Sequence, residues 1–489
     1  VPRTHIHSEL TSPNPYSSPR QMTLNRLYAK VLRDDLAEYV YDASIAGCSY
    51  RVTCVPLGFR VSLSGYSEKL PHLLEVVTSR MLSLIEEMKQ GPKEQGSLAQ
   101  KFEKARESLL RQTKNFRMES PYETCSYMSR MLVEDNVWHV NQYVGEMEDP
   151  LSPLTMEECA RAAEESLLGR GRAESLCMGN INESEAKEVA DIIAQRFRSK
   201  SRPLDDDEIP VFKSLKIPTR EEAVKIYGPG VADLATPTKI EQVVYSAEEE
   251  NNAIQLILQS GSEHELGYEG IATQELLSYV AYNSAYDTLR TKEQLGYIVS
   301  AFTRKTAGGC NGFAVLVQSS STLPEALEER CEAWLTQFRQ ELEEMPEERI
   351  AMEAAAVVAQ LLERDQKLGD EVSSAWGEIL ATEGLSKNSR FPKWNRMEQL
   401  ATYLTVGGKD GDSKDVTAAS LKANMISYFD KYLDAQSPNR RAMCARVYCQ
   451  KAASEFDKNV GKPGVLSNYD DSRHVKQFLA SYPTAPYWL

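Results

Sequence analysis

The feature that constrains this fold most strongly is an internal repeat of about 250 residues, enough for one domain per copy. In the first copy, apolar residues recur at helical spacing from Met22 to Ala46, and Gly47 follows as a helix stop. A predicted hairpin (49–55 and 59–64) and a second helix (70–88) come next. The second copy repeats this order, with a helix over 271–289, hairpin strands over 297–303 and 313–319, and a helix over 323–342.

Short matches between the copies support the repeat. Leu70-Pro71-His72-Leu73-Leu74-Glu75 matches Leu323-Pro324-Glu325-Ala326-Leu327-Glu328, and Glu123-Thr124-Cys125-Ser126 matches Glu371-Val372-Ser373-Ser374. Their shared order and near-constant offset predict two homologous α+β domains, each a mixed β-sheet packed against helices. We place them at residues 1–218 and 219–489, with an exposed link rich in proline, glycine and acidic residues that runs to about residue 240.

Charge and cysteine usage narrow the class of protein. The net charge of −15 disfavours nucleic acid or an anionic membrane as a partner, because both attract basic proteins. The sequence has neither an apolar run long enough for a spanning helix nor the start of a signal peptide. It begins at Val1 without an initiator Met, so we expect a processed product or part of a longer chain. The nine cysteines form no C-x-x-C pair, which predicts reduced thiols and a cytoplasmic location.

The usual catalytic motifs are missing from the sequence. Neither H-E-x-x-H nor H-x-x-E-H occurs, since the partial match that starts at His72 ends in Val76. His5 and His7 share one face of a predicted strand, but no third metal ligand is indicated. A calcium-loop-like start at Asp410 has Lys414 where a ligand should stand. We therefore predict no metal site and no complete catalytic centre in this chain.

The segment from Arg290 to Tyr297 carries the most specific chemistry. Arginine offers five donors in a fixed fork for carbonyl or carboxylate oxygens, and a tyrosine hydroxyl beyond a helix end can donate to developing negative charge. Tyr286, four residues before Arg290, shares its helical face. In the alternative interpretation, Arg290 pairs with Glu293 and Tyr297 packs in the sheet. The first copy has Tyr50 in place of Tyr297, which suggests a shared packing role, but Ala43 in place of Arg290.

This segment resembles the signature of the fourth domain of the insulinase family of zinc peptidases, in Thr288-Leu289-Arg290-Thr291-Lys292-Glu293-Gln294-Leu295-Gly296-Tyr297. Shorter matches to the family are Ala46-Gly47-Cys48-Ser49-Tyr50, Asn115-Phe116-Arg117, Gly179-Asn180-Ile181 and Trp376-Gly377-Glu378-Ile379. The resemblance covers nearly the whole chain and identifies it with the third and fourth domains, the carboxy-terminal half of a four-domain enzyme.

The resemblance implies a metalloendopeptidase whose zinc is held by the amino-terminal half, the partner of this chain around a peptide-binding chamber. In this scheme Arg290 holds the substrate backbone, Tyr297 stabilises the oxyanion and Tyr286 lines an apolar subsite. Relatives often carry phenylalanine where Tyr286 stands, which predicts a more polar subsite here. The alternative is a non-catalytic protein of the same fold, with a chaperone-like role, that binds peptides without cleaving them.

Overall fold

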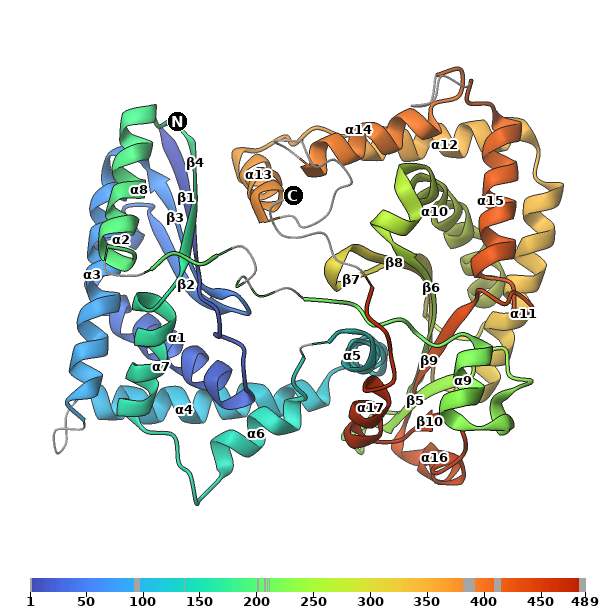
Figure 1. The fold of residues 1–489 in the computed structure, drawn as a ribbon, viewed down its shortest axis with the longest axis horizontal. Helices are drawn as coiled ribbons and strands as arrows, with labels where there is room; N and C mark the ends of the chain where they lie inside the picture. Colours follow the sequence, from blue (N-terminus) through green and yellow to red (C-terminus); the bar gives the residue numbers. More distant parts are fainter. Residues whose placement is uncertain are drawn as a thin grey trace. The chain divides into compact units, whose positions relative to one another are not determined.

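The computed structural model describes residues 2–91, 97–135, 137–199, 202–205, 208, 210, 212–380, 392–408 and 415–482. The chain divides into two compact units (Figure 1). Unit 1 comprises Val1–Phe116, Trp138–Pro210 and Asp365–Leu380, and unit 2 comprises Arg117–Val137, Val211–Arg364 and Ala381–Leu489. No helix of the described residues is long and apolar enough to cross a membrane. The predicted α+β class is confirmed, because each unit combines a β-sheet with packed helices.

Unit 1 is built on a four-stranded sheet with the order β2-β3-β1-β4, in which every pair is antiparallel. Its strands are β1 (Arg3–Thr11), β2 (Ser49–Val55), β3 (Gly58–Tyr66) and β4 (Arg172–Gly179). Ile6 and Leu10 of β1 are fully buried on one face, whereas His5 and His7 alternate onto the other. One face of the sheet therefore carries the core, and the opposite face is polar.

Helices cover the apolar face of this sheet. They are α1 (Pro19–Tyr39), α2 (Tyr41–Ile45), α3 (Leu70–Lys89), α4 (Ser97–Asn115), α6 (Val140–Glu148), α7 (Met156–Leu168) and α8 (Glu183–Phe197). Ser18 caps α1 by accepting a hydrogen bond from the Gln21 amide, and Pro19 occupies the first helical position, where its missing N–H costs nothing. The predicted single helix over 22–46 is wrong in one respect, because the backbone leaves helical geometry at Val40 and separates α1 from α2.

Unit 2 is built on a six-stranded sheet with the order β10-β5-β9-β6-β8-β7. Its strands are β5 (Thr238–Val243), β6 (Asn252–Ser262), β7 (Ile298–Thr306), β8 (Cys310–Ser319), β9 (Arg441–Tyr448) and β10 (Val465–Leu466). The β10–β5 and β5–β9 pairs are parallel and the remaining pairs antiparallel. The predicted second hairpin corresponds to β7 and β8, which leaves β7 at one edge of the sheet and β10 at the other.

The helices of unit 2 pack on both faces of this sheet. They are α5 (Pro121–Val133), α9 (Arg220–Tyr227), α10 (Glu263–Ala285), α11 (Pro324–Glu344), α12 (Glu347–Leu361), α14 (Pro392–Leu404), α15 (Ala418–Tyr432), α16 (Ala453–Asn459) and α17 (Tyr469–Lys476). Residues 212–239, which we expected to form an exposed link, contain α9 and the fully buried Ile217 and Val231. That part of the predicted link is therefore packed into unit 2.

Two helices lie away from the strands of their own sequence copy. Helix α5, encoded within the first copy, packs on β6, β8 and β9 of unit 2 and buries Cys125 there. Helix α13 (Leu368–Leu380), from the second copy, packs on β1 and β4 of unit 1. There Trp376 contacts the His7 ring, at 5.6 Å between centroids, and the Arg60 guanidinium. The two copies therefore exchange one helix each.

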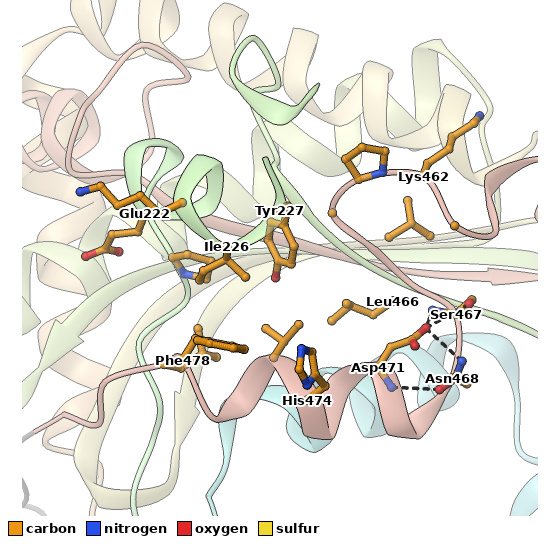
Figure 2. Close-up of a pocket in the computed structure, with 18 of the residues that line it drawn as sticks. Glu222, Ile226, Tyr227, Lys462, Leu466, Ser467, Asn468, Asp471, His474 and Phe478 are labelled. Atoms are coloured by element: carbon orange, nitrogen blue, oxygen red, sulfur yellow. Dashed lines mark hydrogen bonds between the residues drawn. The ribbon is translucent and has the colours of Figure 1, made fainter. Parts of the chain in front are cut away.

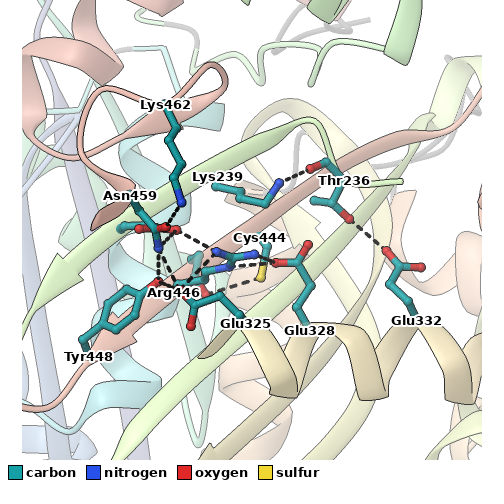
Figure 3. A network of polar contacts seen from close by, with 12 residues as sticks. Thr236, Lys239, Glu325, Glu328, Glu332, Cys444, Arg446, Tyr448, Asn459 and Lys462 are labelled. Atoms are coloured by element: carbon teal, nitrogen blue, oxygen red, sulfur yellow. Dashed lines mark hydrogen bonds and ion pairs between the residues drawn. The ribbon is translucent and has the colours of Figure 1, made fainter. Parts of the chain in front are cut away.

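A buried ionic network joins strands β5 and β9 to helices α11 and α16 (Figure 3). Arg446 of β9 donates to Glu241 and to Glu328, both at 2.8 Å. Asn459, at the end of α16, donates to Glu325 and Tyr448 and so extends the network. Burial raises the pKa of Glu241. Such a network is strongly destabilised when one partner is removed, because the other charge stays buried without compensation.

Candidate functional site

The candidate segment begins where α10 changes its helical form. The helix that we predicted over 271–289 is a regular α-helix only up to Ala285, because residues Tyr286–Lys292 form a π-helix. The amide of Glu293 donates to the carbonyl of Thr288, five residues earlier, at 2.9 Å. Thr288 and Leu289 are buried and hold this turn on the core. Single π-turns within helices are uncommon and are frequent at functional sites.

The turn that follows depends on two unusual backbone positions. Gln294 has a φ of 54°, the left-handed region that L-residues other than glycine seldom adopt. At Gly296 the loop passes so close to β8 that an added Cβ would lie 1.8 Å from the Gln318 carbonyl oxygen. Only glycine fits that approach. Together these positions fix the direction in which Tyr297 leaves the turn.

Arg290 lies against an aromatic ring rather than a carboxylate. Its guanidinium carbon is 4.6 Å from the centroid of the Tyr286 ring, a cation–π contact that confirms the shared helical face. Glu293 instead accepts two hydrogen bonds from Arg330, at 2.5 and 2.8 Å. Within the described residues, Arg290 has no ion pair. The predicted alternative, a pair between Arg290 and Glu293, is therefore wrong.

Tyr297 is 90% exposed and packs on neither face of the sheet. Tyr50, its counterpart in the first copy, is half-buried and packs against the core of unit 1. The shared packing role that we expected for the two rings is therefore wrong, as is the alternative in which Tyr297 packs in the sheet. The difference follows from the local backbone: Tyr50 lies inside β2, whereas Tyr297 precedes β7, directly after the Gly296 approach.

The face of α10 next to this segment continues as an aromatic wall. The rings of Tyr282 and Tyr286 lie 6.3 Å apart between centroids, and both side chains are partly exposed. Tyr282 also lines a cavity of about 360 Å³ together with Tyr279, Phe302 and Val357. Sequence reasoning missed Tyr279 and Tyr282, although their spacing before Tyr286 is that of one helical face.

This arrangement offers hydrogen-bond donors to an extended backbone at the β7 edge of the sheet. Arg290, whose guanidinium carbon lies 4.6 Å from the Tyr286 ring centroid, has five N–H donors, and the exposed phenol of Tyr297 adds one O–H donor. Carbonyl oxygens are the complementary acceptors. The tyrosine rings beside the donors can pack on an apolar side chain.

The remaining predicted positions do not combine with this segment. His5 and His7 stack at 6.5 Å between ring centroids in unit 1, and His7 contacts the Ser62 hydroxyl at 3.0 Å. Across the described ranges, no group of three or more His, Cys, Asp or Glu side chains is placed to hold a metal ion. The calcium-loop-like stretch from Asp410 lies outside the described residues.

Comparison of the chain with known proteins indicates its family. Residues 1–146 match the family described as the middle or third domain of peptidase M16, and residues 276–376 match the PQQ synthase PqqF-like C-terminal lobe domain 4. Human insulin-degrading enzyme is 26% identical over 504 residues, which cover 99% of this chain and 43% of that protein. Together these matches support the carboxy-terminal half of an insulinase-family protein. Its candidate segment, 286–297, lies within the second matched region.

Solved structures agree with the insulinase fold. The crystal structure of pitrilysin superposes with a TM-score of 0.73 at 18% identity, over 99% of this chain and 44% of that one. The peptidase M16 inactive domain from Pseudomonas fluorescens gives a TM-score of 0.56 at 12% identity, over 92% of this chain and 93% of that one. This chain thus spans less than half the length of insulin-degrading enzyme and pitrilysin.

Proposed function

We propose that this chain is the substrate-binding half of a zinc metalloendopeptidase, and that Arg290 and Tyr297 contact the peptide bond to be cleaved. One observation carries the proposal: the same short segment presents Arg290, which has no carboxylate partner among the described residues, and Tyr297, which is 90% exposed. Neither side chain forms an ion pair among the described residues, although Arg290 lies on the Tyr286 ring. The sequence instead uses a π-helix, a left-handed Gln294 and an obligatory Gly296 to present them.

The two side chains suit different atoms of a bound peptide. Arg290 donates to backbone carbonyl oxygens and fixes the register of an extended chain, while Tyr286 and Tyr282 form an apolar subsite beside it. Tyr297 donates its O–H to the carbonyl oxygen as negative charge develops there during cleavage. Such a donor acts most strongly when it is already placed before the reaction, because no reorganisation is then needed.

The described residues do not fit a zinc site, because they contain no suitable cluster of ligands. We place the zinc of the proposed enzyme in the amino-terminal half, as the resemblance implies, where it would supply Lewis-acid chemistry when bound. This chain contributes binding, orientation and hydrogen-bond donation. The amino-terminal half and peptides are its proposed partners, and together the halves enclose a substrate chamber.

The thiol chemistry supports a cytoplasmic location for this assembly. All nine cysteines lie in described residues and are free thiols, most of them buried. Burial raises the pKa of Cys54 and of Cys310 to about 12, so both stay protonated and unreactive at neutral pH. A reducing compartment matches a protein that keeps nine thiols without pairing them.

The proposal is tested in the enzyme assembled from this chain and its amino-terminal half, with a quenched fluorescent peptide as substrate. We expect Arg290→Ala and Tyr297→Phe each to lower kcat/KM by about tenfold to a thousandfold, the loss typical of one oxyanion or backbone donor. Arg349→Ala and Tyr245→Phe are matched controls, because Arg349 is an exposed residue of α12 and the Tyr245 ring keeps its contact with Arg117 without the hydroxyl. Unchanged kcat/KM in both site variants would refute the assigned roles.

The same assay separates the non-catalytic alternative, for which the likeness to an M16 inactive domain is the supporting observation. A protein that captures peptides without cleaving them binds a fluorescent peptide, loses affinity on Arg290→Ala, and releases no product. We expect hydrolysis by the assembled halves instead, and none by this chain alone.

A further inference from the structure

A second site lies at the opposite edge of the unit 2 sheet, beside β10. A cavity of about 970 Å³ opens there between α9, the loop before β10, and α17 (Figure 2). Its volume is in the range of small-molecule pockets. Because β10 and β7 are the two edges of the sheet, this cavity is separate from the segment around Arg290 and Tyr297.

The floor and one wall of the cavity are apolar and partly aromatic. Ile226, Tyr227, Leu466 and Phe478 project toward the same space (Figure 2). Phe478 is 60% exposed, so its ring is accessible to a ligand. Its ring meets the His474 ring edge-on, at 5.3 Å between centroids. A flat ring inserted here would contact aromatic side chains from both α9 and the end of α17.

The rim of the cavity is basic, in a chain whose net charge is −15. Its basic lining residues are Lys216, Lys225, Arg441 and Lys462, and its acidic ones are Glu222 and Asp471. Two of the basic groups have partners outside the lining, because Lys216 pairs with Glu265 at 3.0 Å and Lys462 donates to Asn459 at 2.8 Å. Both acidic groups are already satisfied. Glu222 accepts from Arg441 at 2.7 Å, and Asp471 accepts from the Ser467 amide and hydroxyl and from the Asn468 amide group. Lys225 pairs only with the exposed Glu221 beside it on α9, a weak interaction that a ligand can replace.

One partly buried polar group also faces the cavity. The Tyr227 hydroxyl points into it (Figure 2) and accepts a long hydrogen bond from Thr238, at 3.4 Å. No acceptor for its own proton is recorded in the described part of the chain. Burial raises the pKa of Tyr227 to about 12, so the hydroxyl remains a donor at neutral pH.

We propose that this cavity binds a small aromatic carboxylate, whose ring lies between Tyr227 and Phe478 and whose acid group meets the basic rim at Lys225. The aromatic walls select the ring. Lys225, whose partner Glu221 is exposed and can be replaced, selects the negative charge. The Tyr227 hydroxyl supplies an additional donor. This inference does not depend on the proposed peptidase function, because none of its residues belongs to the Arg290 segment.

The experiment is a calorimetric titration of the whole chain with 2-naphthylacetate, its neutral amide, and decanoate as an aliphatic acid. We expect the aromatic acid to bind at least about fivefold more tightly than either of the other two probes. Phe478→Ser should weaken it about tenfold, and Lys225→Gln about threefold. Tyr245→Ser and Lys187→Gln should leave binding unchanged. Lys187 is a close match for Lys225, since it is equally exposed and pairs with Glu183 one helical turn away.

Each part of the proposal fails on a distinct result. Equal affinity for the acid and the amide overturns the anionic head group, and equal affinity for decanoate overturns the aromatic body. Binding that survives Phe478→Ser moves the probe to another place on the chain and overturns the site. Absence of binding at millimolar probe overturns the proposal altogether. Phe478 is exposed, so the serine variant should fold, which its thermal unfolding checks.

Discussion

The two copies of the repeat join a long helix to an edge strand in different ways. In unit 1 the helix breaks at Val40, Gly47 turns the chain with a φ of 80°, and Tyr50 lies on the core. In unit 2 the helix widens into a π-turn, Gln294 takes the left-handed position, and Tyr297 points into solvent. The first copy thus places glycine at the left-handed position of this junction, where it is unstrained. The second copy places Gln294 there, at a cost in free energy. Strain retained at one junction only is typical of a functional site.

The side chains of the two junctions also differ, and the charged ones occur only in the second copy. Where the second copy has Arg290, the first has Ala43, and in the same alignment Ala46 and Ser49 stand opposite Glu293 and Gly296. The first copy therefore keeps the topology without the charges and without the close approach to the neighbouring strand. Substitutions at paired positions test whether these differences matter.

The largest effect is expected at Gly296. In Gly296→Ala the new methyl group meets a backbone carbonyl at 1.8 Å, which no side-chain movement can relieve. We expect the free energy of unfolding to fall by about 3 kcal/mol, the upper range for overpacking. Ser49→Ala, at the paired position, loses one exposed hydroxyl contact with Ser64 and should change stability by less than about 0.5 kcal/mol. Chemical denaturation of both variants measures the contrast, and equal losses would contradict it.

The next effect concerns the carboxylate that Arg330 holds away from Arg290. In Arg330→Ala, Glu293 is released and can pair with Arg290 one helical turn earlier, in competition with the peptide. We expect KM of the assembled enzyme to rise about threefold to tenfold, with kcat little changed. The double variant Arg330→Ala with Glu293→Gln should recover the original KM. If it does not, Arg330 acts in some other way.

A smaller effect on stability is expected at Gln294 and Gly47, the two residues with positive φ at these junctions. Gln294→Gly removes the cost of a side chain at positive φ and should leave stability unchanged or raise it by up to about 1 kcal/mol. Gly47→Ala should lower stability by about 1 kcal/mol, because alanine is strained at a φ of 80°. The loss stays small because the new Cβ meets only ordinary contacts, at 3.4 Å and beyond. Thermal unfolding should show a lower melting temperature for Gly47→Ala and an unchanged or higher one for Gln294→Gly.

The smallest effect is a pH dependence confined to unit 1. Burial lowers the pKa of His5 and of His7 below 6.5, and Arg3 and Arg60 reinforce the shift. The folded state therefore binds fewer protons than the unfolded state just below pH 6.5, and stability falls as the pH drops through that window. We expect amide exchange in β1 to accelerate at acid pH more than exchange in β6. His7→Gln should weaken this response.

The sequence predicts the repeated elements well and their surroundings poorly. The hairpin strand at 49–55 and the helix over 70–88 match β2 and α3 within a residue, because alternation and helical spacing are local signals. The α10 π-turn has no such signal, since Tyr286 to Lys292 read as an ordinary helix. The residue types of the candidate site were identifiable. The exposure of Tyr297 was not, because it depends on how closely Gly296 approaches β8.

Long-range partners account for the other differences. The apolar face of a helix can be read from its spacing, but the sheet that it covers cannot, so the exchange of α5 and α13 left no mark in the sequence pattern. The same holds for Arg446 and its partners Glu241 and Glu328, which come from three separate stretches of chain. A segment such as 212–239 reads as a link by composition and is packed by tertiary contacts.

The exchanged helices also govern the order in which this chain can be completed on the ribosome. Helix α5 emerges early but has no sheet to cover until β6, β8 and β9 have been synthesised. The polar face of β1, with His7, waits still longer for Trp376 of α13. Neither unit can therefore finish before the other has been largely translated, and nascent chains must stay partly open over most of their synthesis.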